Sequence, residues 1–95
     1  MKFLALEREL PNASADAFLP LLKAEARGVW ELQQSGAVRE TYFNANAHTA
    51  VLVLECSDVE AAHHLLAKLP LVQAGLITFD VIPLVPYDGF ERLFA

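Results

Sequence analysis

The sequence predicts a single α+β domain in which two helices cover one face of an antiparallel sheet. Strand-like and helix-like segments follow one another in the order β-α-β-β-α-β, which is the ferredoxin-like arrangement. The length of 95 residues suits one core, and no internal repeat or low-complexity segment competes with this interpretation. We assign residues 1–86 to the domain and residues 87–95 to a C-terminal arm.

The first half of the chain predicts one strand and one long helix. Residues 2–8 form a strand that stops at a cluster of Pro, Asn and Ser. Asn12 or Ser14 can cap the helix expected over 15–35, and Gly36 ends it. Its apolar residues recur at intervals of three and four, as one buried stripe requires. These residues are Phe18, Leu22, Ala26, Val29 and Leu32.

The second half of the chain predicts a hairpin, a helix and a last strand. We expect strands over 37–44 and 49–56, a helix over 58–69, and a strand over 76–85. Asp58 is placed to cap the helix, and Pro70 ends or bends it. The inner face of this helix consists of Ala62, Leu65, Leu66 and Leu69.

Two of the strands are apolar on both faces, which predicts assembly. Residues 50–56 are apolar except for Glu55, and residues 76–84 are nearly as apolar. The helices can cover only one face of the sheet, and a composition that is 55% hydrophobic is rich for so short a chain. A second copy of the same sheet is the simplest cover for the other face, giving a homodimer with the form of a dimeric α+β barrel.

Composition and charge argue against several other classes of protein. The net charge is −5 with Lys and Arg scattered singly, so no basic patch for nucleic acid is expected. No apolar run approaches the ~18 residues of a membrane span. A single cysteine, Cys56, precludes an internal disulfide and fits a reducing cytoplasm. The three histidines and this cysteine are poorly spaced for metal, and we expect neither a metal nor another cofactor.

Glu25 is the first candidate for chemistry because it interrupts the apolar stripe of the first helix. A carboxylate in a pocket has a raised pKa and makes a good general base. The alternative is that Glu25 lies at the edge of the stripe and reaches solvent or a strand arginine. Arg39 opens the second strand, where it could hold a substrate carboxylate or pair with a buried acid.

Three further residues are candidates for ligand binding. Tyr42 shares a strand with Arg39, and strict alternation would put Thr41 and Phe43 on the Arg39 face. His48 lies in the hairpin turn, either as a donor to the ligand or as a solvated surface histidine. Asp80 interrupts the last strand, as a buried carboxylate or as half of an interfacial ion pair. The cluster Glu60, His63 and His64 points away from the inner face of its helix, which indicates a solvated surface.

Four short motifs resemble those of the muconolactone isomerase family. The helix run EARGVWELQQSG resembles the family helix that ends in Glu-Leu-Gln-x-x-Gly, and Arg39 with Tyr42 follows it. LAKLPL and DVIPL resemble the Leu-Pro-Leu and acidic-Val-x-Pro-Leu segments of the family. The chain departs from the family at Tyr42-Phe43, where Trp-Arg is typical, at the hairpin NAH, and in its added C-terminal residues.

The resemblance implies a dimeric α+β barrel and a proton shift within an unsaturated lactone or a related small acid. Glu25 would be the base, Arg39 its electrostatic partner, and Tyr42 or His48 a donor. The same barrel also hosts cofactor-free oxygenases and proteins that bind a small ligand without chemistry, and both remain alternatives, as does a purely structural or partner-regulating oligomer.

The C-terminal arm carries Phe90, Leu93 and Phe94, which occupy one face of a helical turn. With one Arg against two acids and only three apolar anchors, this turn is a poor membrane anchor. We expect the arm to pack on a neighbouring subunit, where it would seal the barrel edge or join dimers into a higher oligomer.

Overall fold

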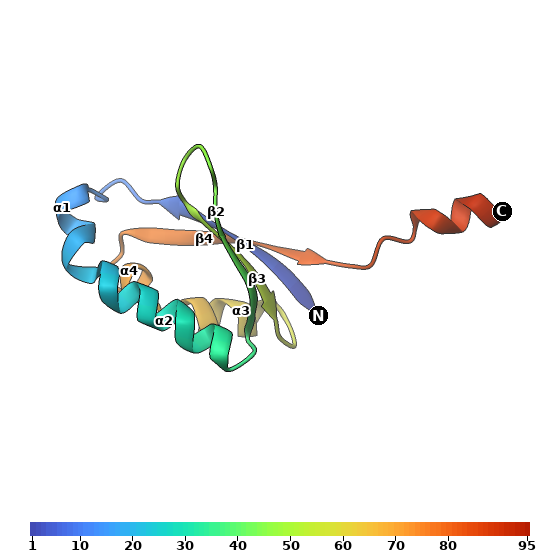
Figure 1. Cartoon of the computed structure of the whole chain (residues 1–95), viewed down its shortest axis with the longest axis horizontal. Coiled ribbons are helices and arrows are strands. Elements are labelled where there is room, and N and C mark those ends of the chain that lie inside the picture. The colour runs from blue at the N-terminus through green and yellow to red at the C-terminus, as the bar shows by residue number, and fades with distance from the viewer.

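A computed structural model describes residues 1–95 and has a four-stranded antiparallel sheet with its helices on one side (Figure 1). The strand order is β2-β3-β1-β4, so the two strands nearest the chain ends pair with each other. The strands are β1 Lys2–Glu9, β2 Val38–Phe43, β3 Ala50–Glu55 and β4 Ile77–Leu84. The helices are α1 Ala15–Phe18, η1 Leu19–Leu21, α2 Leu22–Gln34, α3 Val59–Leu66, α4 Pro70–Gln73 and η2 Gly89–Phe94. The predicted α+β fold class and its ferredoxin-like element order are confirmed.

The core lies between the helices and one face of the sheet. The strands contribute the alternate residues that point toward the helices, as the pleat requires. The buried strand residues are Phe3, Ala5, Val38, Leu52, Leu54, Ile77 and Phe79. The helical layer meets them with Leu32, Ala62, Leu66, Leu69 and Leu71. No buried side-chain polar atom lacks a hydrogen-bond partner.

The helices begin where the caps were expected but divide at prolines. Ser14 Oγ accepts a hydrogen bond from Ala17 N–H (3.2 Å), and Asp58 Oδ1 accepts one from Ala61 N–H (2.8 Å). The helix expected over 15–35 is interrupted by the 3₁₀ turn η1, which contains Pro20. The helix expected over 58–69 ends already at Leu66, and Pro70 opens the short helix α4, which the sequence did not predict. Proline suits a first helical position because no partner is needed there for an N–H.

A β-bulge in β2 changes which side chains face the helices. Val38 pairs with Leu54 and Thr41 pairs with Leu52, and both partners belong to the core. An extra residue therefore lies between them, at the register shift between positions 38 and 40. The expectation that Arg39 shares a face with Thr41 and Phe43 is wrong, because it assumed uninterrupted alternation.

The other face of the sheet is an apolar surface that no helix of this chain covers; we call it the open face. Its central side chains are partly exposed, with Ile82 at 43%. They are Leu4, Leu6, Val51, Val53 and Ile82, as the strand register shows. None of the helices has the length and apolar character needed to cross a membrane.

The C-terminal arm extends away from the domain (Figure 1), and the chain measures 56 Å along its longest axis against 28 and 20 Å along the others. Within the arm the Tyr87 ring contacts Phe90 edge to face, with centroids 4.9 Å apart. A Cβ at Gly89 would meet the Tyr87 ring, so a larger residue there would require the exposed Tyr87 side chain to move aside. Leu93 and Phe94 remain 75% and 87% exposed.

Candidate functional site

A cavity of about 760 Å³ lies between α2 and the helix-facing side of the sheet. Most of its wall is apolar, and its polar groups come from β1, α2 and the β2–β3 hairpin. The apolar and aromatic wall includes Phe18, Leu22, Val29, Trp30, Phe43 and Leu52. The polar lining consists of Glu7, Glu9, Glu25, Gln33, Thr41, Tyr42 and His48. An apolar cavity with a few convergent polar groups is typical of a small-molecule site.

Glu25 projects from α2 into this cavity and is anchored there by the backbone. Its Oε1 accepts a hydrogen bond from Leu71 N–H at 2.9 Å. Leu71 is the second residue of α4, where an amide has no partner within its own helix. Burial raises the pKa of the Glu25 carboxyl, the Leu71 hydrogen bond opposes this, and the charge of Glu7 raises the pKa further.

Gly28 lets α2 approach α4 closely enough for this contact. A Cβ at position 28 would lie 3.1 Å from Leu69 Cδ2 and 3.6 Å from Pro70 Cδ. Leu69 is fully buried, so it has little room to move aside. The close approach brings the start of α4 within reach of Glu25, one turn earlier on α2.

Glu7 is a second half-buried carboxyl in the same cavity, and sequence reasoning missed it. Its Oε1 accepts a hydrogen bond from Ala50 N–H at 3.1 Å. Burial raises its pKa, the Ala50 hydrogen bond lowers it, Glu9 raises it, and His48 lowers it. The sequence signal was the alternation of β1, in which Glu7 continues the face of Phe3 and Ala5.

His48 lies in the hairpin turn and stacks on the last residue of β2. Its φ of 55° is left-handed, and its N–H donates to Asn44 O at 2.8 Å. The imidazole stacks on the Phe43 ring with centroids 4.2 Å apart and planes 15° apart. The turn therefore presents the imidazole to the cavity that Glu7 and Glu25 also line.

Tyr42 touches the cavity rim but directs its hydroxyl elsewhere. The phenol donates a hydrogen bond to Glu40 Oε1 at 2.6 Å, and this contact raises the Tyr42 pKa. Tyr42 pairs with Val51, so its side chain belongs to the open face of the sheet.

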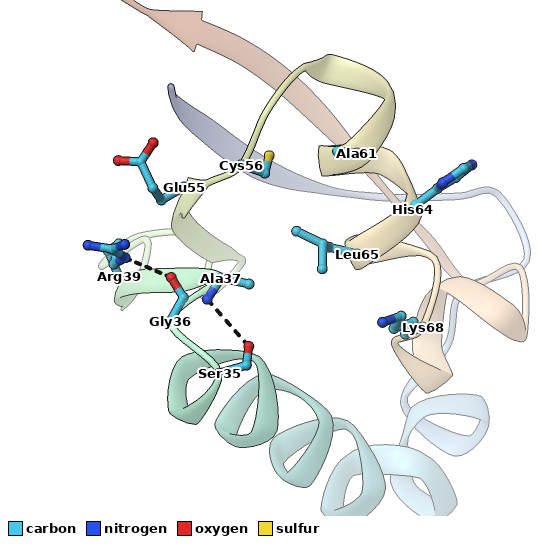
Figure 2. A pocket seen from close by; sticks show the side chains of 10 residues that line it. All are labelled: Ser35, Gly36, Ala37, Arg39, Glu55, Cys56, Ala61, His64, Leu65 and Lys68. Carbon is cyan, nitrogen blue, oxygen red and sulfur yellow. Dashed lines mark hydrogen bonds between the residues drawn. The ribbon is translucent and has the colours of Figure 1, made fainter.

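Arg39 lies in a different hollow, of about 550 Å³, between the start of β2, the end of β3 and α3 (Figure 2). Its Nε donates to Gly36 O at 2.7 Å. Cys56, His64 and Lys68 line the same hollow, and burial raises the pKa of the Cys56 thiol, which disfavours a reactive thiolate. Within one chain the structure does not bring Arg39 to Glu25.

Asp80 also lies outside the cavity. It is on the open face, where its carboxylate meets the Arg8 guanidinium at 3.4 Å and remains 56% exposed. Within one chain Asp80 is therefore not a buried carboxylate, and its pairing with Arg8 is intramolecular. An interfacial ion pair of Asp80 stays a prediction. No group of three or more acidic, His or Cys side chains is arranged to hold a metal ion.

The geometry in the cavity suits proton transfer to and from a small ring. Glu25 is a carboxylate held at a fixed point, with a pKa moved toward neutrality, which is what a general base requires. His48 supplies an imidazole that can donate a hydrogen bond, from the hairpin rather than from α2. Of the predicted site residues, Glu25 and His48 line this cavity and Tyr42 lies at its rim, whereas Arg39 and Asp80 lie elsewhere. Glu7 lines the cavity as well and was not predicted.

Two solved structures share this fold over nearly their whole lengths. A muconolactone isomerase has a TM-score of 0.75 and 24% identity, covering 93% of this chain and 92% of that chain. A 5-chloro-2-hydroxyhydroquinone dehydrochlorinase from Burkholderia phenoliruptrix AC1100, in complex with 2,5-dihydroxybenzoquinone, has a TM-score of 0.74 and 16% identity, covering 94% of this chain and 98% of that chain. At sequence identities of 16% and 24%, the structural similarity establishes the fold alone.

No curated protein sequence matches the chain significantly. The muconolactone delta-isomerase family, however, matches residues 3–89, which include nearly every strand residue and all the helices that surround the cavity. The resemblance inferred from the short motifs is confirmed. The chain belongs to the muconolactone delta-isomerase family.

Proposed function

We propose that this protein is a small-molecule isomerase that shifts a proton within an unsaturated lactone or a related small ring. The observation that carries the proposal is Glu25, a half-buried carboxyl anchored at the wall of a largely apolar cavity. The family supports the class of reaction, and the two fold neighbours are named as an isomerase and a dehydrochlorinase.

In the proposed reaction Glu25 removes a proton from the saturated carbon attached to the end of the conjugated carbonyl system. The electron pair moves onto the carbonyl oxygen, and the double bond shifts as the same carboxyl returns the proton to a different carbon. The reaction is an isomerisation, in which no atom or electron is gained or lost overall. His48 is the donor that stabilises the enolate oxygen, and Tyr42 contributes to the rim of the ligand site.

A small-ligand-binding protein without chemistry is the second candidate. Its support is the absence of Lys and Arg from the lining of the cavity, which leaves His48 as the single group in one chain able to carry positive charge there. An enolate is stabilised best by a preorganised positive charge or several donors, and one histidine provides less than that.

The assembly proposed with this function is a homodimer formed through the open face. Packing two such faces together would bury the apolar centre around Leu6, Val51 and Val53. The exposed Leu93 and Phe94 of the arm support a further contact with a neighbouring subunit. The single cysteine suits the reducing environment of the cytoplasm, where we place the protein.

Deuterium exchange tests the proposed proton transfer without the natural substrate. The probe is a five-membered unsaturated lactone in buffered D₂O, followed by proton NMR. We expect the protein to accelerate exchange next to the carbonyl and the Glu25→Gln variant to lose at least about a hundredfold of that rate, in line with the loss of a general base. Glu31→Gln is the matched control, because Glu31 is an exposed carboxylate on the same helix outside the cavity. Full exchange by Glu25→Gln would refute the role of Glu25.

A further inference from the structure

The charges that face the cavity restrict the ligands it can take. Glu7, Glu9 and Glu25 line it, and no Lys or Arg does. His48 is the one lining residue able to carry positive charge, and its ring is stacked on Phe43. Glu7 and Glu25 already use backbone N–H donors from Ala50 and Leu71, so those donors are not free for an anionic ligand.

The position that could have supplied a cation is occupied by Phe43. Phe43 faces the cavity at the end of β2, opposite Ala50, and supports the His48 ring. The one arginine of β2, Arg39, lies before Thr41 and donates to the Gly36 carbonyl in the other hollow. This edge of the sheet therefore offers an aromatic surface to the ligand in place of a guanidinium.

We propose that the site takes uncharged planar rings and discriminates against ligands that carry a free carboxylate. A carboxylate in the cavity would lose hydration and meet glutamates without a matching cation, and both effects oppose binding. A neutral ring would instead contact Phe43, Trp30 and the aliphatic wall, while its carbonyl oxygen accepts from His48. The inference rests on the proposed function for the location of the site, and it concerns binding alone.

The test uses two ligands that differ in charge and hardly in size. One is a five-membered unsaturated lactone with an acetic acid side chain, and the other is the primary amide of that acid. Trp30, the single tryptophan of the chain, lines the cavity and reports binding through its fluorescence. At about pH 7.5 and low salt we expect the amide to bind at least about tenfold more tightly than the acid, since low salt leaves the repulsion unscreened.

Variants identify the cause of the discrimination. Glu9→Gln and Glu7→Gln remove negative charge from the lining, and a glutamine oxygen at position 7 can still accept from Ala50 N–H. In the double variant the preference for the amide should fall to about threefold or less, through tighter binding of the acid. Glu31→Gln removes the same charge outside the cavity and should preserve the preference. Glu9→Gln alone, at an exposed strand end, tests the effect without risk to folding.

Equal affinities, tighter binding of the acid, or no binding of the amide would overturn the inference. Tighter binding of the acid would indicate that a cation from another chain faces the cavity. A preference for the amide without any proton exchange would leave this inference intact and refute the proposed isomerase activity, so the two failures are distinguishable.

Discussion

Two substitutions at Glu25 separate what its hydrogen bond contributes from what its charge costs. Glu25→Gln keeps an oxygen that can accept from Leu71 N–H, whereas Glu25→Ala removes it. Both variants remove the half-buried charge. The difference in unfolding free energy between them therefore measures the hydrogen bond, and the difference between Glu25→Gln and the wild type measures the charge.

The magnitude of the first difference follows from the contact. Leaving a buried N–H without an acceptor costs about 1–3 kcal/mol. Leu71 is buried, but its hydrogen bond to Glu25 is only partly buried. Water can therefore hydrogen-bond to the freed N–H in part, which favours a cost in the lower half of that range. Alanine recovers about 0.4 kcal/mol through its better helix propensity within α2. Glu25→Ala should therefore be about 1 kcal/mol less stable than Glu25→Gln at every pH.

The second difference depends on pH with a definite sign. The pKa of Glu25 in the folded protein is raised above the ordinary value of 4.5, so the folded state binds this proton more tightly than the unfolded state. Below the unfolded pKa the wild type has no penalty at this site. As pH rises through the folded pKa, the wild type loses stability that Glu25→Gln keeps. The Gln variant should thus gain on the wild type between about pH 4 and pH 8, while losing proton-exchange activity.

Urea denaturation followed by circular dichroism at about pH 4, 6 and 8 provides the three free energies, all at one protein concentration because assembly would also affect them. If Glu25→Gln and Glu25→Ala were equally stable, the Leu71 hydrogen bond would contribute nothing. If the gap between Glu25→Gln and the wild type did not widen with pH, the burial of this carboxylate would be refuted.

Four further results are expected. Asp58→Ala removes the acceptor for Ala61 N–H at the start of α3 and should cost about 1 kcal/mol in urea denaturation; no loss would show that the cap is dispensable. Asp80→Asn breaks an exposed ion pair and should lower the free energy of unfolding by less than ~1 kcal/mol without changing the rate of proton exchange. A large loss of exchange would show that Asp80 takes part in the reaction. Deleting residues 88–95 should lower the number of subunits measured by light scattering, and Val53→Asp should dissociate the proposed dimer; an unchanged number of subunits would contradict the assembly proposed for the arm and the open face.

The sequence predicted the fold well because local signals and the global arrangement agree. Periodicity located all four strands to within a residue or two, and Ser14 and Asp58 act as the caps they were expected to be. Gly36 adopts a φ of 85° where the helix was predicted to end. The division at Pro20 and the start of α4 at Pro70 were less predictable, because a proline can end, bend or begin a helix depending on what packs around it.

The candidate site was predicted only in part, since it depends on contacts between distant residues. The position of Glu25 in an apolar stripe indicated a carboxyl in unusual surroundings, yet its partner Leu71 lies 46 residues away. One bulge in β2 separated Arg39 from Thr41 and Phe43, and bulges leave no firm mark in a single sequence. The alternation of β1 places Glu7 on the same face as Phe3 and Ala5. It could not identify Glu7 as a site residue from the sequence, because only the three-dimensional structure shows that this face meets the helices.

The position of the cavity follows from the inward-facing residues of β1 and α2, which change from apolar to acidic where the two elements face each other. Along β1 the helix-facing residues pass from buried Phe3 and Ala5 to Glu7, and toward the start of α2 the inward residues pass from buried Leu32 to Glu25. A carboxyl cannot pack as a core residue does, so at this boundary the two layers leave the cavity open between them. Because each carboxyl is held by a backbone N–H, the boundary is fixed, and these two carboxyls of raised pKa lie where a ligand can enter. The same two carboxyls that interrupt the apolar packing therefore create the site.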